Sequence, residues 1–206
     1  MNFIEFRNRF LSLACFTTNQ VYALYPEFNR NNLGNWVRQG YLIRLRQGYY
    51  TFPEFRESAE FTLYFANIIY KPSYISLHTA LSFYDIIPEA IPKITSVTTL
   101  KTITFSNDFW EYSYKSIKPD MMFGYDLREM ESGRRIMFAT PEKALIDLLY
   151  LYPFYNTERD LKELRLDESF MNDDLNRERL TEFSDRIGSK ALSNRIDMLR
   201  KVYNNK

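Results

Sequence analysis

The stretch WVRQGYLIRLRQGYYTF, residues 36–52, changes its hydrophobic period from helical spacing to alternation at Gly40. Apolar residues alternate with arginines after this glycine, and the pair Gln47 and Gly48 is typical of a tight turn. YYTF, residues 49–52, is rich in strand-forming side chains. The stretch therefore predicts the end of a helix and then a β-hairpin with one apolar and one cationic face.

The helix that ends at Gly40 is predicted over residues 30–39, with Asn29 as its cap. Leu33, Trp36 and Val37 share one face at spacing i, i+3 and i+4, and we expect that face to be buried. The polar residues of this helix then lie on its open faces: Arg30, Asn31, Asn32, Asn35 and Arg38.

Two further helices are predicted before this one. Residues 4–13 carry an imperfect apolar stripe, and Thr17 and Thr18 offer an N-cap for a helix that stops at Pro26. Three helices followed by a hairpin is the order of a winged helix-turn-helix, which we predict over residues 1–56. In that fold the third helix enters the major groove of DNA and the hairpin lies along the backbone.

A larger α/β domain is predicted over residues 57–206, behind the polar segment PEFRESAEF. Residues 93–140 are expected to form a mixed or antiparallel sheet of four or five strands flanked by helices, with LKTITFSND ambiguous. The prolines of IPEAIP, residues 87–92, predict an irregular connection, and Thr140 with Pro141 predicts a helix start. The remaining C-terminal residues are predicted to be helical, so the fold class is α+β.

Arginine supplies every basic side chain of residues 1–56. Seven arginines stand against three glutamates there, a net charge of +4; the whole chain carries +1, so residues 57–206 carry −3. The guanidinium fork suits phosphate and guanine, and an asparagine amide can read adenine. The pattern predicts a surface for double-stranded DNA made of Thr18, Arg30, Asn31, Asn32, Asn35, Arg38, Arg44, Arg46, Gln47 and Tyr49.

Two interpretations of this N-terminal unit stay open. A winged helix can also serve only as a protein-docking module, and the modest charge of +4 is compatible with that role. The hydroxyl of Tyr49 can contact a phosphate, or its ring can pack within the hairpin. In the second domain, Arg134, Arg135 and Lys143 form either a cationic patch or partners for neighbouring acids.

The residues needed for catalysis or cofactor binding are scarce. His78 is the only histidine and Cys15 the only cysteine, and we interpret both as structural. The few glycines form no phosphate-binding loop. We expect no enzyme activity, no cofactor and no metal. Because no apolar run approaches the roughly 18 residues that cross a bilayer, we also expect no membrane contact and a cytoplasmic location.

The sequence resembles the AbiEi-like antitoxins of abortive-infection, type IV toxin-antitoxin systems over roughly residues 4–155. Three segments carry the resemblance: GYLIRLRQGYY at 40–50, SLHTALSFYDIIPE at 76–89 and ATPEKALIDLL at 139–149. It implies an N-terminal winged helix that binds inverted repeats in the promoter of its own operon, with DNA contacts from residues 30–38 and 44–49. It also implies a C-terminal antitoxin domain that opposes a nucleotidyltransferase toxin.

The resemblance therefore predicts an antitoxin that is also an autorepressor, and it implies no catalytic residue. An alternative is a winged-helix regulator whose C-terminal domain senses a small molecule. A nucleic-acid-processing enzyme would need a clustered acidic or metal site, which the sequence does not provide.

Overall fold

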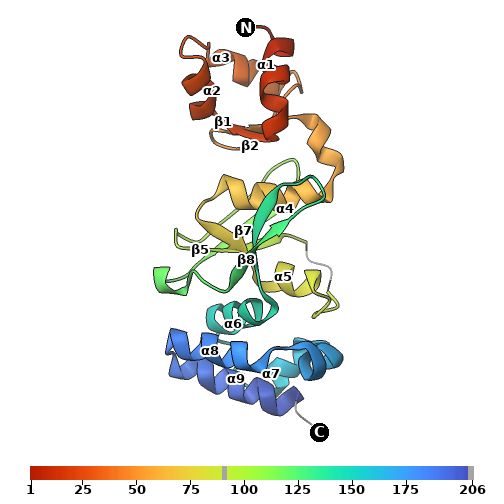
Figure 1. Ribbon diagram of the computed structural model, residues 1–206, viewed down its shortest axis with the longest axis vertical. Coiled ribbons are helices and arrows are strands. Elements are labelled where there is room, and N and C mark those ends of the chain that lie inside the picture. Colours follow the sequence, from red (N-terminus) through yellow and green to blue (C-terminus); the bar gives the residue numbers. More distant parts are fainter. Residues whose placement is uncertain (90–91, 204–206) are drawn as a thin grey trace.

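The computed structural model describes residues 1–89 and 92–203. The molecule is elongated, with the N-terminal helices at one end, a large sheet in the middle and the C-terminal helices at the other end (Figure 1). It is α+β, with a small three-stranded sheet and a mixed six-stranded sheet. The fold class and the mixed sheet are as the sequence predicts.

The N-terminal elements are short and follow one another closely. They are α1 (Phe3–Phe10), the 3₁₀ turn η1 (Leu11–Leu13), β1 (Cys15–Thr17), α2 (Thr18–Leu24), α3 (Asn31–Arg38), β2 (Ile43–Arg46), β3 (Tyr49–Thr51) and the 3₁₀ turn η2 (Pro53–Glu57).

The starts of α2 and α3 depend on local side-chain caps. The Thr17 hydroxyl accepts a hydrogen bond from the Gln20 amide at 3.2 Å, and the Gln20 side chain accepts one in return from the Thr17 amide at 2.7 Å. The Asn29 side chain accepts a hydrogen bond from the Asn31 amide at 3.0 Å. The capping box of α2 is formed by Thr17, one of the two threonines predicted. The N-cap of α3 is Arg30, one residue after the predicted Asn29, and the Arg30 side chain makes no capping hydrogen bond.

The small sheet contains one strand that the sequence analysis missed. Its order is β1-β3-β2, so β1 pairs with β3 on the side away from β2. The hairpin itself is as predicted, with its turn at Gln47 and Gly48, where Gly48 takes φ +80°. β1 has only three residues, too few for an alternating pattern to be recognised.

An aromatic core joins α1, α3 and the small sheet. Phe6 and Phe10 of α1, Phe16 of β1 and Trp36 of α3 are all buried, and the rings of Phe6 and Trp36 lie 4.8 Å apart. Leu33 is buried beside them, whereas Val37 is only half-buried. The apolar face predicted for α3 therefore holds this helix against α1 and leaves its polar face outward.

The second part of the chain contains the large sheet and most of the helices. Its elements are α4 (Ala59–Ile69), β4 (Ser73–Ile75), α5 (Leu77–Phe83), β5 (Ile94–Thr98), β6 (Ile103–Ser106), β7 (Glu111–Ser116), η3 (Pro119–Met121), β8 (Tyr125–Glu129), β9 (Arg135–Ala139), α6 (Pro141–Leu151), α7 (Glu158–Glu163), the π-helical turn η4 (Phe170–Asp174), α8 (Arg177–Ile187) and α9 (Lys190–Tyr203).

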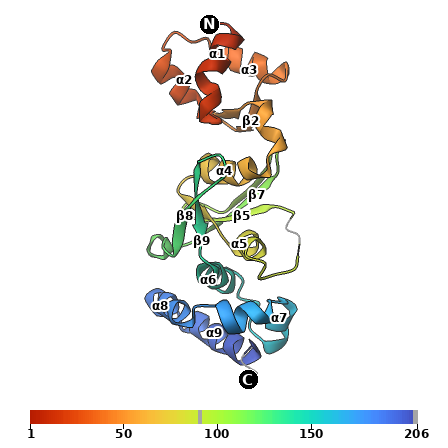
Figure 2. The ribbon, with the colours of Figure 1, turned by 45° about the vertical axis from the view of Figure 1, so that its right-hand side comes forward.

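The six strands run in the order β6-β7-β5-β4-β9-β8. β4 is central, antiparallel to β5 and parallel to β9. α4 lies between this sheet and the N-terminal unit, while α5 and α6 lie on the other side, with α7, α8 and α9 beyond them (Figure 2). α6 packs against α5, α8 and α9 and so connects the sheet to the C-terminal helices.

Residues 93–140 contribute five strands, in agreement with the four or five predicted, and the sixth strand, β4, lies before this segment, where no strand was predicted. β4 lies in the segment PSYIS, whose three strand residues are all buried and show no alternation. The ambiguous run LKTITFSND contains the edge strand β6. Thr140 caps α6 by accepting a hydrogen bond from the Lys143 amide at 3.3 Å, as predicted. Of the predicted irregular connection IPEAIP, Ala90 and Ile91 lie outside the described residues.

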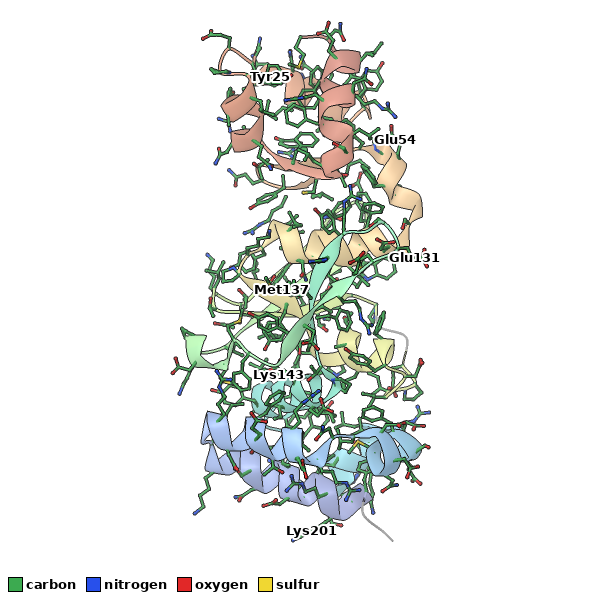
Figure 3. All side chains as sticks on the ribbon, in the orientation of Figure 1. Tyr25, Glu54, Glu131, Met137, Lys143 and Lys201 are labelled. Carbon is green, nitrogen blue, oxygen red and sulfur yellow. The ribbon has the colours of Figure 1, made fainter. Side chains whose placement is uncertain are left out.

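A buried ion pair ties α6 to the central strand. The side chains of Lys143 and Asp147 are both fully buried and in contact, and Lys143 lies where the sheet meets the C-terminal helices (Figure 3). The second carboxylate oxygen of Asp147 accepts hydrogen bonds from Tyr74 at 2.8 Å and Ser76 at 2.7 Å. Burial raises the pKa of Asp147, and Lys143 and the two hydroxyl donors oppose that rise.

The cationic patch proposed for Arg134, Arg135 and Lys143 does not exist. Lys143 is buried, Arg135 lies 3.5 Å from Glu129, and Arg134 donates a hydrogen bond to the Ser12 carbonyl at 2.6 Å. The interpretation as partners of neighbouring groups is therefore correct for Arg135. Lys143 faces the protein interior because α6 presents this side to the sheet.

Gly124 packs directly against the aliphatic part of Lys143. A Cβ at Gly124 would lie 2.8 Å from Cε2 of Phe183 and 3.0 Å from Cδ of Lys143, and Gly124 has φ +72°. We predict that Gly124→Ala lowers the free energy of unfolding by about 2 to 4 kcal/mol, because overpacking adds to the left-handed backbone strain. Urea unfolding measures the change.

Gly133 provides the matched control for this substitution. It has φ +75°, but a Cβ added there would meet no other atom within 4 Å. Gly133→Ala should therefore lower the free energy of unfolding by only about 1 kcal/mol, the cost of a left-handed backbone at alanine. Equal losses for the two variants would show that packing around Lys143 contributes nothing.

Candidate nucleic-acid interface

The polar face of α3 is the most accessible part of the predicted DNA-binding set. Arg30, Asn31 and Arg38 are exposed, and Asn32 and Asn35 are half-buried. The Asn35 side-chain oxygen accepts a hydrogen bond from the Arg38 guanidinium. One turn of helix therefore presents a guanidinium and an amide side by side, the two groups that read guanine and adenine in a major groove.

Arg44 lies on the same side of the small sheet as the N-terminal helices. It is exposed and pairs across the hairpin with Tyr50, which packs into the aromatic core. Arg44 also borders a surface hollow of about 320 Å³ beside Val37 near the end of α3. The structure therefore brings Arg44 close to α3, although the two are separated by a turn in the sequence.

The hairpin does not have the single cationic face that the sequence predicts. The strand register shifts between Arg44 and Arg46, so Arg44 lies opposite Tyr50 and Arg46 lies opposite Tyr49. A bulge of this kind adds one residue to a strand and reverses the alternation of its side chains. Arg44 and Arg46 therefore lie on opposite faces of the sheet.

Arg46 is held against the second part of the chain. Its guanidinium donates a hydrogen bond to the Ile69 carbonyl at 3.0 Å and lies 4.5 Å from the ring centroid of Tyr70. Ile69 is the last residue of α4, so Arg46 satisfies a carbonyl that the helix leaves without an internal partner. Its place in the DNA-contacting set is not supported.

Tyr49 lies on the same face as Arg46 and packs, half-buried, against the larger hydrophobic core. Of the two interpretations left open for Tyr49, this contact favours packing. Thr18 and Gln47 lie together at the hairpin turn, since the Thr18 amide donates a hydrogen bond to the Gly48 carbonyl at 3.0 Å. Gln47 is exposed there.

The exposed arginines near α3 differ in their acidic neighbours. Arg7 pairs with Glu54 at 2.6 Å and Arg56 pairs with Asp108 at 3.0 Å. Within residues 1–89 and 92–203, no carboxylate lies within ion-pair distance of three arginines: Arg30, Arg38 and Arg44. These three lie on or beside α3 and are available to a polyanion there, and Arg9 on α1 is likewise exposed and absent from the ion pairs of the described residues.

Arg56 is a residue that the sequence analysis did not place in the site. It lines the same hollow as Arg44, and its partner Asp108 follows the edge strand β6. No sequence pattern links positions 44, 56 and 108, because they meet only when the hairpin packs against the second part of the chain.

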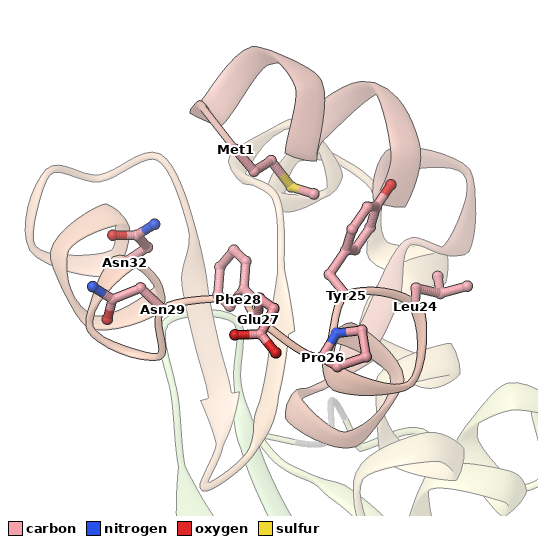
Figure 4. Close-up of a pocket in the computed structure, with 8 residues that line it drawn as sticks. All are labelled: Met1, Leu24, Tyr25, Pro26, Glu27, Phe28, Asn29 and Asn32. Atoms are coloured by element: carbon pink, nitrogen blue, oxygen red, sulfur yellow. The ribbon is translucent and has the colours of Figure 1, made fainter.

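A second hollow lies beside the start of α3. It has a volume of about 420 Å³ and is lined by Met1, Leu24, Tyr25, Pro26, Glu27, Phe28, Asn29 and Asn32 (Figure 4). Its lining includes the Glu27 carboxylate, which repels phosphate. Asn32 therefore borders an apolar and acidic hollow, unlike Asn31 and Asn35.

Of the two residues considered for catalysis, Cys15 is buried and His78 is half-buried. Cys15 is buried, and burial raises the pKa of its thiol to about 12, so the reactive thiolate is suppressed. Burial lowers the pKa of His78, whose ring makes an edge contact with Tyr152. The described part of the chain contains no group of three side chains placed to hold a metal ion.

No family model matches the sequence, and no curated protein matches it. The resemblance to AbiEi-like antitoxins is therefore carried by the three segments quoted above alone. Among the described residues, no helix has both the length and the apolar character that a membrane span requires.

We predict that Arg46→Ala destabilises the protein. The free energy of unfolding should fall by about 1 to 3 kcal/mol, because the substitution removes a charge-assisted hydrogen bond and a cation–π contact together. Urea and thermal unfolding measure it. Arg44→Ala is the control, because it removes the same type of side chain from the exposed face of the same strand. Its free energy of unfolding should stay within about 0.5 kcal/mol of the wild-type value. Similar losses at both positions would contradict the assignment of Arg46.

Proposed function

We propose that residues 1–56 form a winged helix-turn-helix that binds double-stranded DNA through α3. In this proposal the chain is the AbiEi-like antitoxin and autorepressor of a toxin-antitoxin operon, it binds inverted repeats in its own promoter, and it opposes a nucleotidyltransferase toxin. It needs no cofactor and has no catalytic residue.

The order of the N-terminal elements supports the winged-helix part of the proposal. Helix, strand, helix, helix and two strands follow one another, with α2 and α3 as the helix-turn-helix and β2–β3 as the wing. α3 has a buried apolar side, with Leu33 and Trp36 in the core, and a polar side outward. Such a helix can enter a major groove without exposing its own core contacts.

The observation that carries the proposal is the set of arginines without acidic partners. Arg38 and Asn35 would contact base edges from α3, Arg30 would contact the backbone at its start, and Arg44 would contact an adjacent phosphate. The remaining predicted contacts are Asn31 on α3, with Thr18 and Gln47 at the hairpin turn. Asn32 borders the acidic hollow, and Arg46 and Tyr49 face inward, so we leave these three out.

We predict that Arg38→Ala and Arg44→Ala each weaken promoter binding by about 1 to 3 kcal/mol. The two losses should differ in kind, because Arg38 would read a base and Arg44 a phosphate. Arg38→Ala should reduce the preference for the promoter over unrelated DNA, whereas Arg44→Ala should weaken both and lower the salt dependence of binding. Gel-shift titrations at several salt concentrations measure both effects.

Arg177 provides a matched control. It is exposed on α8, at the far end of the molecule from α3. Arg177→Ala removes the same charge and should leave promoter binding unchanged. If Arg38→Ala and Arg44→Ala both bind as tightly as wild type, the DNA-binding assignment is wrong.

The antitoxin part of the proposal is supported by the resemblance of residues 76–89 and 139–149. We predict that a nucleotidyltransferase encoded beside this protein arrests growth when expressed alone and is tolerated when this chain is co-expressed. Deletion of residues 1–56 separates the two activities, because protection without promoter control would assign the antitoxin activity to the second part. Growth arrest that persists with the full chain contradicts the proposal.

A small-molecule sensor is the second candidate. It is favoured by a hollow of about 710 Å³ between the start of α4 and the β8–β9 hairpin, bordered by Leu63, Phe83 and Ile136 as well as charged side chains. That volume is within the range of ligand sites. A compound that raises the melting temperature and also changes promoter affinity would support this candidate over the antitoxin.

A further inference from the structure

β8 forms one edge of the six-stranded sheet. It pairs with β9 on one side, and no other strand of the described chain pairs with it. Figure 2 shows it at the outer margin of the sheet. The opposite edge is β6, with the sequence ITFS, which contains no charged residue. β8 has the sequence YDLRE, in which an acid and a base flank a central leucine.

The hydrogen-bond pattern shows which backbone groups of β8 point outward. The Met130 amide donates to the Arg134 carbonyl at 2.7 Å, and the Thr140 amide donates to the Gly124 carbonyl at 3.0 Å. In an antiparallel ladder, bonded and non-bonded positions alternate, so the even-numbered residues of β8 bond to β9. The N–H and C=O groups of the odd-numbered residues therefore point away from the sheet: Tyr125, Leu127 and Glu129.

This edge lacks two of the features that usually prevent strand pairing, although it is short and carries charged side chains. β8 contains no proline and no lysine. Leu127 is 62% exposed and lies directly opposite Met137, which is 37% exposed; Met137 is labelled in Figure 3. The open edge thus combines outward backbone groups with a pair of exposed apolar side chains.

The charges of β8 are self-complementary in one register. Asp126 and Arg128 lie on the face opposite to Leu127, and neither has an ion-pair partner within the described part of the chain. The Arg128 guanidinium lies 4.5 Å from the centroid of the Phe83 ring and 5.6 Å from that of Phe138, so it rests on aromatic rings of that face. An antiparallel copy centred on Leu127 would place each Asp126 directly opposite an Arg128.

We propose that a second copy of this chain pairs with β8 in an antiparallel arrangement, about a two-fold axis at Leu127. The outward groups of Leu127 then bond to those of the partner's Leu127, and those of Tyr125 bond to the partner's Glu129. Asp126 faces the partner's Arg128 as a non-bonded pair, in which Cα atoms approach to about 4.5 Å. The two large sheets become one continuous sheet.

The two-fold register satisfies several requirements at once. It uses only odd-numbered residues for backbone pairing, it forms two opposite-charge pairs, and it covers Leu127 and Met137 of both copies. Moving the axis by two residues in either direction keeps the backbone pairing but loses both charge pairs. A foreign strand could use the backbone groups, but the arrangement of acid and base about Leu127 favours a second copy.

A cysteine cross-link tests the register. Facing residues of a bonded antiparallel pair have Cα atoms about 5.5 Å apart, within the range of a disulfide. Leu127→Cys should therefore form an intermolecular disulfide under mild oxidation of the full chain. Glu129→Cys is the control, because the two copies of this residue would be offset by about 13 Å along the strands. The native Cys15 is buried and should not react.

A charge swap tests the same interface without cross-linking. Asp126→Arg should raise the dimer dissociation constant about tenfold, because like charges then face each other. The double variant Asp126→Arg, Arg128→Glu restores opposite charges and should recover most of the affinity. Glu182→Arg on α8 is exposed and makes the same charge change away from the edge, so it should have no effect.

Sedimentation equilibrium of the full chain measures these constants, and the melting temperature of each variant shows that it is folded. A wild-type chain that stays monomeric up to high concentration overturns the proposal, even if a strand of another protein is then found to pair with β8. So does equal cross-linking of Leu127→Cys and Glu129→Cys, or a dimer that Asp126→Arg leaves unchanged. These outcomes are independent of promoter binding and toxin neutralisation.

Discussion

The contact between Arg46 and the last carbonyl of α4 determines how the rest of the N-terminal unit is presented. A guanidinium removed from water needs hydrogen-bond acceptors, and the end of α4 supplies one together with an aromatic ring. Asn107 adds a second bond across this junction by donating to the Leu45 carbonyl at 3.0 Å. One face of the small sheet is therefore committed to the second part of the chain, and α3 is left on the opposite, open side.

The second constraint is the buried pair of Lys143 and Asp147. Its carboxylate also accepts hydrogen bonds from Tyr74 in the central strand β4 and from Ser76 just after it, which fixes α6 to this strand. Removal of either Lys143 or Asp147 would leave the other charge buried without a partner, which is strongly destabilising. α8 and α9 pack on α6, so the position of α6 also determines where these C-terminal helices lie.

Together these constraints distribute the functional surfaces along the molecule. Arg30, Arg38 and Arg44, which have no acidic partners among the described residues, lie beside α3 at one end, whereas the open edge of β8 lies in the middle and the C-terminal helices lie at the other end (Figure 1). A DNA duplex at α3 and a second copy at β8 would use different parts of the chain. A two-fold dimer would also present two copies of α3, which suits the symmetry of an inverted repeat.

Much of the local structure was determined by the sequence by itself, because caps, turns and periodicity act within a few residues. Examples are the Thr17 cap of α2, the hairpin turn at Gly48, the buried side of α3 and the start of α6 at Thr140. Tertiary structure alone decided which charged side chains are available. A bulge reversed Arg46, and packing of α6 buried Lys143. The three-residue strands β1 and β4 are stabilised by pairing with strands distant in the sequence. Desolvation depends on neighbours distant in the sequence, so no local pattern could separate the exposed Arg44 from the enclosed Arg46.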